Sequence, residues 1–114
     1  MRFLLKAVLD TERANHLART GQLGSVIKQI VDEQKPEAAY FTDDHGKRTG
    51  LLVLDMKDVS QIPALAEPWF LALNAHIEFH PVMTPADLEK AGPGIERAAK
   101  TYGQYSSTTT RAAA

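Results

Sequence analysis

The sequence contains no cysteine, no block of five or more basic residues and no long apolar run. Without cysteine, disulfide bonds, thiolate chemistry and cysteine-based metal sites are excluded. No stretch approaches the ~18 apolar residues that a transmembrane helix needs. With 13 Lys and Arg against 14 Asp and Glu, the formal net charge is −1, so the basic surface of a nucleic-acid binder is also missing. We therefore expect a cytoplasmic protein with neither a membrane nor a nucleic acid as partner.

What the chain has is the composition of one ordinary globular domain. It is 114 residues long, with 44% hydrophobic and 24% charged residues, enough for one core and too short for two. The first ten residues, MRFLLKAVLD, carry an apolar run that Lys6 interrupts and Asp10 ends, which indicates a strand and not a signal peptide. We predict a single domain over residues 1–102 and a flexible tail over 103–114, because the tail is rich in Ser, Thr and Ala and lacks apolar periodicity.

Apolar periodicity gives the order of the elements. Runs and alternating patterns predict strands over residues 2–9, 38–42, 48–56 and 75–80. Helical spacing marks residues 12–19, 23–31, 60–73, 84–91 and 95–102, with breaks at Gly21 and at Gly92-Pro93-Gly94. The order is βαββαβ followed by an extra C-terminal helix. We therefore predict an α+β, ferredoxin-like fold, in which the two helices of the βαββαβ order cover one face of a four-stranded antiparallel sheet.

The strand over residues 48–56 predicts a second cover for that sheet. Leu51, Leu52, Val53 and Leu54 are consecutive, so they point alternately to both faces. The helices cover only one face, and apolar side chains on the other also need to be shielded from water. A second copy of the same sheet is the simplest shield, which makes a homodimer the expected assembly.

The chain resembles the dimeric α+β barrel superfamily over about residues 1–91. The resemblance is carried by the element order and by the segments EQKPEAAYF (33–41), LLVLDM (51–56), ALAEPWF (64–70) and IEFHPVMTPADL (77–88). It is closest to a group of short bacterial proteins of that superfamily with no assigned activity. Related branches include cofactor-free oxygenases, small-ring isomerases, haem-degrading enzymes and dye-decolourising peroxidases. The resemblance implies two facing sheets that enclose a cavity. No catalytic motif of these branches is present whole, so no catalytic residue is transferred.

The candidate site centres on His76, Glu78 and His80. Strand alternation puts these three on one face and Ile77 and Phe79 on the other, where they suit the helices. Histidine titrates near neutral pH and a carboxylate can fix its tautomer, so His76 is the predicted acid–base group and Glu78 the residue that orients it. His80 is a predicted ligand-binding residue. The alternative is that the three lie at the rim of the sheet and meet only water or ion-pair partners.

Two further residues join this candidate site. Lys6 interrupts an apolar strand and would point into the cavity as an anion partner, or else pair with a carboxylate such as Glu78. Tyr40 is a possible hydrogen-bond donor, although an aromatic residue in a strand often serves packing alone. Metal binding stays open as an alternative for the histidines. Because His76 and His80 would be about 13 Å apart along a straight strand, they could share an ion only if the strand bends.

The remaining chemistry-bearing residues have simpler interpretations. Trp69 continues an apolar helical stripe and belongs to the core, His45 belongs to a hairpin turn, and His16 is a solvated helix residue. No dinucleotide, P-loop, nucleophile-elbow or HExxH motif occurs, and no cofactor is expected. We expect a homodimer that binds a small, partly apolar organic molecule between its sheets, with cofactor-free acid–base chemistry of an oxygenase or isomerase type. The alternative is a non-catalytic ligand-binding or assembly module.

Overall fold

The computed structural model describes residues 1–113, with the backbone alone described for residues 106–113. The chain divides into two compact units, one over residues 1–82 and one from Met83 onward. The elements of the first unit are β1 (Arg2–Val8), α1 (Thr11–Arg19), α2 (Leu23–Gln34), β2 (Ala38–Asp44), β3 (Lys47–Asp55), the 3₁₀ turn η1 (Val59–Gln61), α3 (Ile62–Leu73) and β4 (His76–Pro81). Those of the second unit are α4 (Pro85–Lys90) and α5 (Gly92–Ala113).

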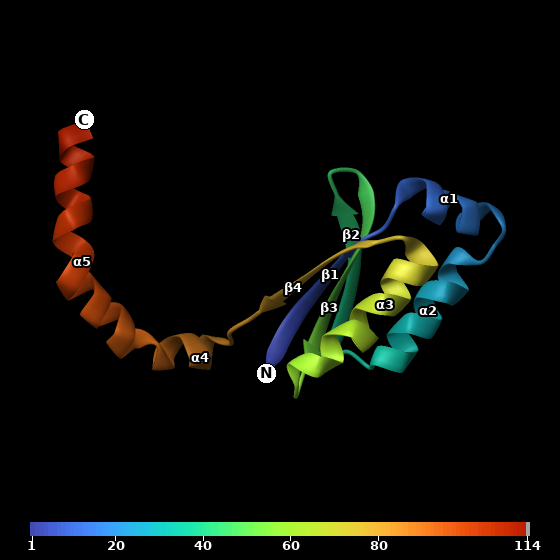
Figure 1. Ribbon diagram of the computed structural model, residues 1–114, viewed down its shortest axis with the longest axis horizontal. Coiled ribbons are helices and arrows are strands. Elements are labelled where there is room, and N and C mark those ends of the chain that lie inside the picture. The colour runs from blue at the N-terminus through green and yellow to red at the C-terminus, as the bar shows by residue number, and fades with distance from the viewer. Residues whose placement is uncertain (114) are drawn as a thin grey trace. The chain divides into compact units, whose positions relative to one another are not determined.

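The four strands form one antiparallel sheet in the order β2-β3-β1-β4. The two central strands are β3 and β1, and the edge strands are β2 and β4. The helices α1, α2 and α3 all lie on one side of this sheet (Figure 1). The predicted α+β, ferredoxin-like fold with an extra C-terminal helix is therefore confirmed.

Alternation along β1 divides the sheet into two faces. Leu5 and Ala7 are fully buried under the helices, whereas Leu4 and Lys6 are only partly buried on the other side. Trp69 of α3 is also fully buried in this core. We call the helix-bearing side the covered face and the opposite side the open face. The three helices of the first unit shield the covered face.

The β2–β3 hairpin has the tightest connection in the sheet. Its loop is His45-Gly46, and both residues have positive φ, 51° and 79°. Two positive φ angles in a two-residue loop are those of a type I′ turn, whose twist matches that of the strands it joins. The hairpin predicted from Asp43-Asp44-His45-Gly46 is confirmed, and β2 continues to Asp44, two residues beyond the predicted end.

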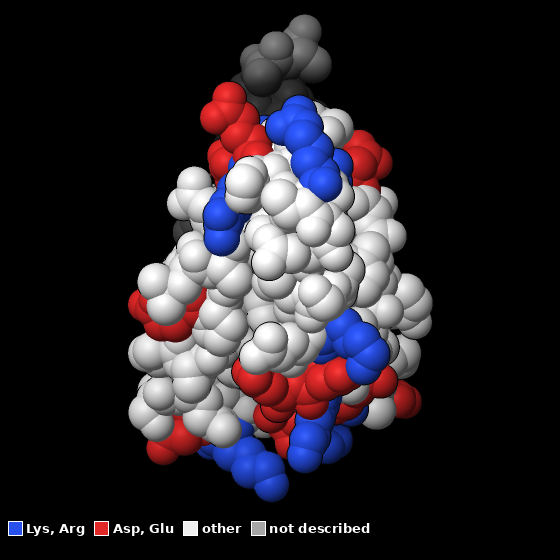
Figure 2. Space-filling model, turned by 90° about the vertical axis from the view of Figure 1, so that its right-hand side faces the viewer, with Lys and Arg blue, Asp and Glu red and all other residues white. Residues whose placement is uncertain are grey.

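A side-chain cap begins the first helix, and a glycine separates it from the second. The Asp10 side chain accepts a hydrogen bond from the Arg13 backbone N–H at 3.0 Å and caps α1. Gly21, with φ 73°, separates α1 from α2 at the predicted break. The outer side of this helical layer bears its charged groups mainly toward its two ends and few in the middle (Figure 2).

The second unit consists of two helices. Thr84 and Asp87 form a capping box at the start of α4. The break between the helices falls at Ala91, and the predicted breakers Gly92-Pro93-Gly94 instead form the first residues of α5. The α5 helix runs from Gly92 through Ala113, past the predicted helix end at residue 102. The domain boundary at residue 102 and the flexibility of 103–114 stay predictions. Among the described residues, none of the helices combines the length and the apolar character that a membrane span requires.

Candidate functional site

The strand β4 separates apolar from polar side chains in the way its sequence predicts. Ile77 and Phe79 are partly buried and pack against the core on the covered face. His76, Glu78 and His80 therefore share the open face. The side chains of His76 and His80 are 72% and 53% exposed, and that of Glu78 is 39% exposed. In a single chain these groups meet solvent, and they do not contact the helical layer.

Three of the predicted site residues lie in one row across the open face. Glu78 of β4 is the register partner of Lys6 of β1, and Lys6 is the partner of Leu51 of β3. Leu51 is in turn the partner of Tyr40 of β2. Directly opposed residues of an antiparallel ladder point to the same face. The sheet therefore aligns an acid, a base, an apolar residue and a phenol from one edge to the other.

Glu78 links the two histidines of β4. Its Oε1 lies 2.9 Å from His80 Nε2, and its Oε2 lies 3.5 Å from His76 Nε2. The hydrogen bond with His80 is the largest cause that lowers the pKa of the Glu78 carboxyl below its usual value, and the positive charge of Lys6 adds to it. Glu78 is thus a carboxylate at neutral pH. It is nearer to His80 than to His76, the histidine that the sequence singled out for acid–base chemistry.

Lys6 makes its ion pair with a residue that sequence reasoning did not assign to the site. Its Nζ lies 2.9 Å from Asp44 Oδ2, and this hydrogen bond is the largest cause that raises the Lys6 pKa, with the charges of Asp44 and Glu78 contributing further. The same bond is the largest cause that lowers the pKa of Asp44, and a hydrogen bond with His45 at 2.8 Å is the second. Asp44 looked like a turn residue in the sequence. Asp44 follows Tyr40 in β2 at an even spacing, which places both side chains on the open face. This spacing is the sequence signal that could have identified Asp44.

An open depression of about 420 Å³ lies beside this ion pair. Its lining residues are Val8, Asp44, His45, Lys47, His76 and Glu78. It therefore brings together the predicted acid–base group, its carboxylate and the hairpin turn. Lys6, Tyr40 and His80 share the open face but are not among the lining residues.

The residue types at this site are those of proton transfer, and metal binding by the histidines is the alternative. An imidazole beside a carboxylate can take up and return a proton near neutral pH, since the carboxylate stabilises the protonated ring. Among residues 1–105, whose side chains are described, no group of three or more His, Cys, Asp or Glu is arranged to hold a metal ion.

Other residues singled out in the sequence lie away from this face. Trp69 is fully buried, and its indole Nε1 donates to Gln34 Oε1 at 3.2 Å, so its assignment to the core is confirmed. His16 is an exposed residue of α1.

Comparisons with known proteins add no assignment to this geometry. No protein-family model matches the chain, and no curated protein matches it.

Proposed function

We propose that the chain forms a homodimer whose two open faces enclose a site for a small, partly apolar organic molecule, with cofactor-free acid–base chemistry at His76 and Glu78. The observation that carries the proposal is the row of Glu78, Lys6, Leu51 and Tyr40 across the sheet face opposite α1, α2 and α3. This row offers both an apolar surface and groups that can bind or move a proton.

The apolar part of the open face supports a second copy as its cover. Leu4, Val8, Leu51 and Val53 lie on this face and are each partly buried within one chain. Leu4 is the register partner of Val53, and Leu51 lies two residues before Val53 on the same face, so these three apolar side chains are neighbours across the two central strands. Removing apolar surface from water contributes roughly 25 cal/mol per Å², so a facing sheet of the same composition would stabilise the dimer.

The polar part of the face supports the acid–base role. In the enclosed space, a neutral imidazole at position 76 would take a proton from the bound molecule, and the Glu78 carboxylate would stabilise the imidazolium that forms. Negative charge that develops on the molecule would be stabilised by Lys6. Tyr40 would supply a hydrogen bond at one end of the row, and His80 would supply one beside Glu78 at the other end. Chemistry of this kind corresponds to an oxygenase or an isomerase that uses no cofactor.

The rival function is a non-catalytic ligand-binding or assembly module. One observation favours it: Asp44 lies 2.9 Å from Lys6 and already neutralises the cation that would stabilise an anion. A ligand-binding face needs only complementary surface, whereas catalysis needs a group whose charge is available to the reacting atoms.

The first test is the assembly. Light scattering on the purified protein should give about twice the chain mass of 12.5 kDa at micromolar concentration. A stable monomer would exclude a site enclosed by two sheets.

The second test is the ligand. Native mass spectrometry of protein purified under mild conditions, followed by extraction and identification of bound small molecules, should give a compound that stabilises the protein on re-addition. The variants His76→Ala and Glu78→Gln should abolish turnover of that compound but retain part of its binding. His16→Ala, which removes an exposed histidine from α1, is the matched control and should change neither. Binding without turnover in the unmodified protein would favour the non-catalytic module.

A further inference from the structure

A second pocket lies on the other side of the sheet, between the helices and the hairpin. It has a volume of about 330 Å³, within the ~300–1,000 Å³ of pockets that hold small molecules. Its lining residues are Leu9, Ile27, Phe41, Thr42, Arg48 and Thr49. They come from the end of β1, from α2 and from both strands of the hairpin. It shares none of its lining residues with the depression on the open face.

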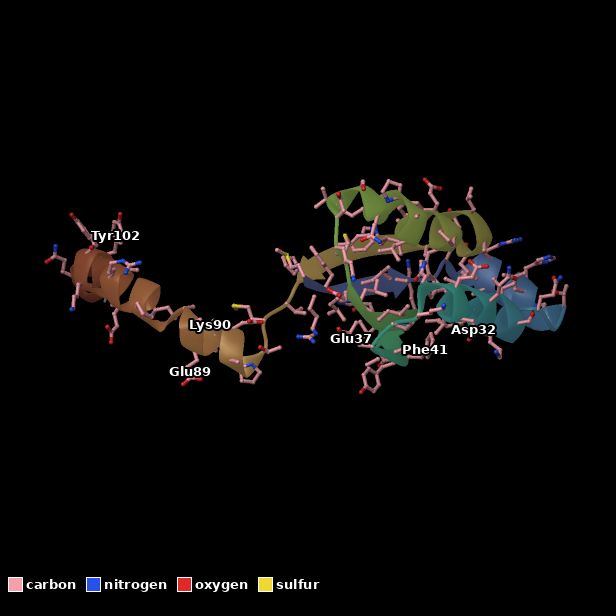
Figure 3. All side chains as sticks on the ribbon, turned by 90° about the horizontal axis from the view of Figure 1, so that it is seen from below. Asp32, Glu37, Phe41, Glu89, Lys90 and Tyr102 are labelled. Atoms are coloured by element: carbon pink, nitrogen blue, oxygen red, sulfur yellow. The ribbon has the colours of Figure 1, made fainter. Side chains whose placement is uncertain are left out.

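The floor of this pocket depends on a glycine in β3. Phe41 of β2 is the register partner of Gly50, and Figure 3 shows Phe41 on β2 toward the helical side. A Cβ at position 50 would lie 3.3 Å from Phe41 Cε1, closer than nine in ten contacts of this kind. The absence of a side chain at Gly50 thus lets the aromatic ring lie down on the backbone of β3. Even so, Phe41 is 56% exposed, so one side of the ring is available to a ligand.

Arg48 supplies the one charged group in this lining. It lies on the covered face, two residues before Gly50, and its Nη1 donates to Asn15 Oδ1 of α1 at 2.9 Å. That bond uses one of the five N–H donors of the guanidinium and orients the group. Among residues 1–105, Arg48 forms no ion pair; its cross-strand partner Asp43 instead accepts from the Gly46 N–H at 3.2 Å.

We propose that this pocket binds a small monocarboxylate with an aromatic or branched apolar body. The body lies on the ring of Phe41 between Leu9 and Ile27, and the carboxylate meets the guanidinium of Arg48. A guanidinium presents a planar pair of donors that matches the two oxygens of a carboxylate. A phosphate monoester, with its higher charge, would find a single cation and an otherwise apolar lining. This inference is independent of the dimer and of the acid–base site.

The probe for this proposal is phenylacetate, with phenylacetamide as its neutral isostere. Phenylacetate is titrated into the full chain, and its binding is measured by calorimetry and by amide chemical shifts. The binding should be saturable, with the largest shifts at Ile27, Phe41 and Arg48. Phenylacetamide should bind at least ~10-fold more weakly, because it lacks the charge that pairs with Arg48. Equal affinities for the two probes, or no binding of phenylacetate at millimolar concentration, would overturn the proposal.

Variants separate the charge from the apolar surface. Arg48→Gln should weaken phenylacetate about 10-fold and leave phenylacetamide unchanged, whereas Phe41→Ala should weaken both. Both side chains are exposed, so both variants should fold, and thermal unfolding checks this. Arg19→Gln, which removes an exposed arginine from α1, is the matched charge control and should bind like the unmodified protein.

A last variant distinguishes this pocket from the open face. Lys6→Met should leave phenylacetate affinity unchanged, since Lys6 does not line this pocket. If Lys6→Met removes binding and Arg48→Gln does not, the carboxylate binds at the open face and the assignment to this pocket is wrong.

Discussion

The two faces of the sheet both bear apolar side chains but differ in how far these are buried. On the covered face, Leu5, Ala7 and Leu52 are fully buried beneath α1, α2 and α3. On the open face, their neighbours Leu4 and Leu51 are only partly buried and alternate with charged groups. Within residues 1–82, three helices cover one face of the sheet. The other face mixes half-buried apolar side chains with charged ones.

The largest expected effect belongs to the covered face. Trp69→Ala should lower the free energy of unfolding by about 3–5 kcal/mol, because it leaves a cavity in the core and removes the hydrogen-bond partner of Gln34. Urea unfolding followed by circular dichroism measures it. Tyr40→Ala, the truncation of an aromatic residue that is 65% exposed on the open face, is the matched control and should cost far less in a monomer. Near-native stability of Trp69→Ala would show that Trp69 is not a core residue.

The next effect tests whether a second copy covers the open face. Leu51→Glu places a carboxylate in the middle of that face and should raise the dimer dissociation constant roughly 100-fold or more, because an uncompensated charge would be buried between the sheets. Sedimentation equilibrium over a range of concentrations measures it.

The matched control uses the same substitution on the other side of the molecule. Leu71 is 79% exposed on α3, on the helix side opposite the buried Trp69, so Leu71→Glu should leave the dimer intact. If Leu71→Glu dissociates the dimer and Leu51→Glu does not, the helical layer is the interface.

A smaller effect concerns the ionic groups of the open face at low pH. The folded-state pKa values of Glu78 and Asp44 are lowered from 4.5 and 3.8, so the unfolded chain binds more protons in this range. Their contribution to stability is complete above the unfolded pKa values and is lost as the pH falls through the lowered ones. Lys6→Met removes a cause of both shifts, so the loss of stability between pH 6 and pH 3 should be shallower in this variant.

The control for this pH dependence is another ion pair of similar length. Lys28 Nζ lies 2.6 Å from Asp32 Oδ2 on the exposed side of α2. Lys28→Met should leave the loss of stability between pH 6 and pH 3 nearly unchanged, since exposed ion pairs contribute little to the free energy of unfolding. The Lys6 pKa is raised, so the stability it adds is present below pH 10.5 and is lost as the pH rises through the higher folded value. If the two variants lose the same stability between pH 6 and pH 3, Lys6 does not cause the lowered pKa values of Glu78 and Asp44.

Patterns within one element were readable from the sequence. The alternation of His76, Ile77 and Glu78 predicted which side chains share a face, because the period of a strand is two. Asp43-Asp44-His45-Gly46 predicted the hairpin from its turn residues. Helical spacing placed Trp69 in the core. Each of these inferences needs neighbouring residues only, and the structure confirms each of them.

Contacts between elements were beyond the reach of the same reasoning. The Lys6–Asp44 ion pair crosses β3, so it depends on the register of three strands at once. The contact between Phe41 and Gly50 likewise follows from the register of the hairpin, and an isolated glycine in a strand could equally have marked a bulge. The pocket beside Arg48 needs, in addition, the place where α2 meets the sheet. A sequence pattern gives the face of a residue but not its partner on the next strand.

The smallest expected effect belongs to the second unit, which contrasts with both faces of the sheet. The α4 helix has no buried residue, and Ile95, Tyr102 and Tyr105 are each more than half exposed. Figure 3 shows Tyr102 on α5, and its ring lies 6.5 Å from that of Tyr105 in a tilted arrangement. A helix that buries so little adds little to the stability of a fold, since packing of an apolar face supplies most helix stability.

Removal of residues 104–114 should therefore shift the melting temperature by less than about 2 °C, the scale of a surface change in a chain of this size. Differential scanning calorimetry at two protein concentrations tests this. Removal of residues 83–114 in a second variant extends the comparison to the whole unit. A large loss that grows as the protein is diluted would mean that this helix docks on a second copy. A large loss independent of concentration would mean that it packs against its own chain. Either outcome would contradict the prediction that the second unit adds little to the stability of the fold.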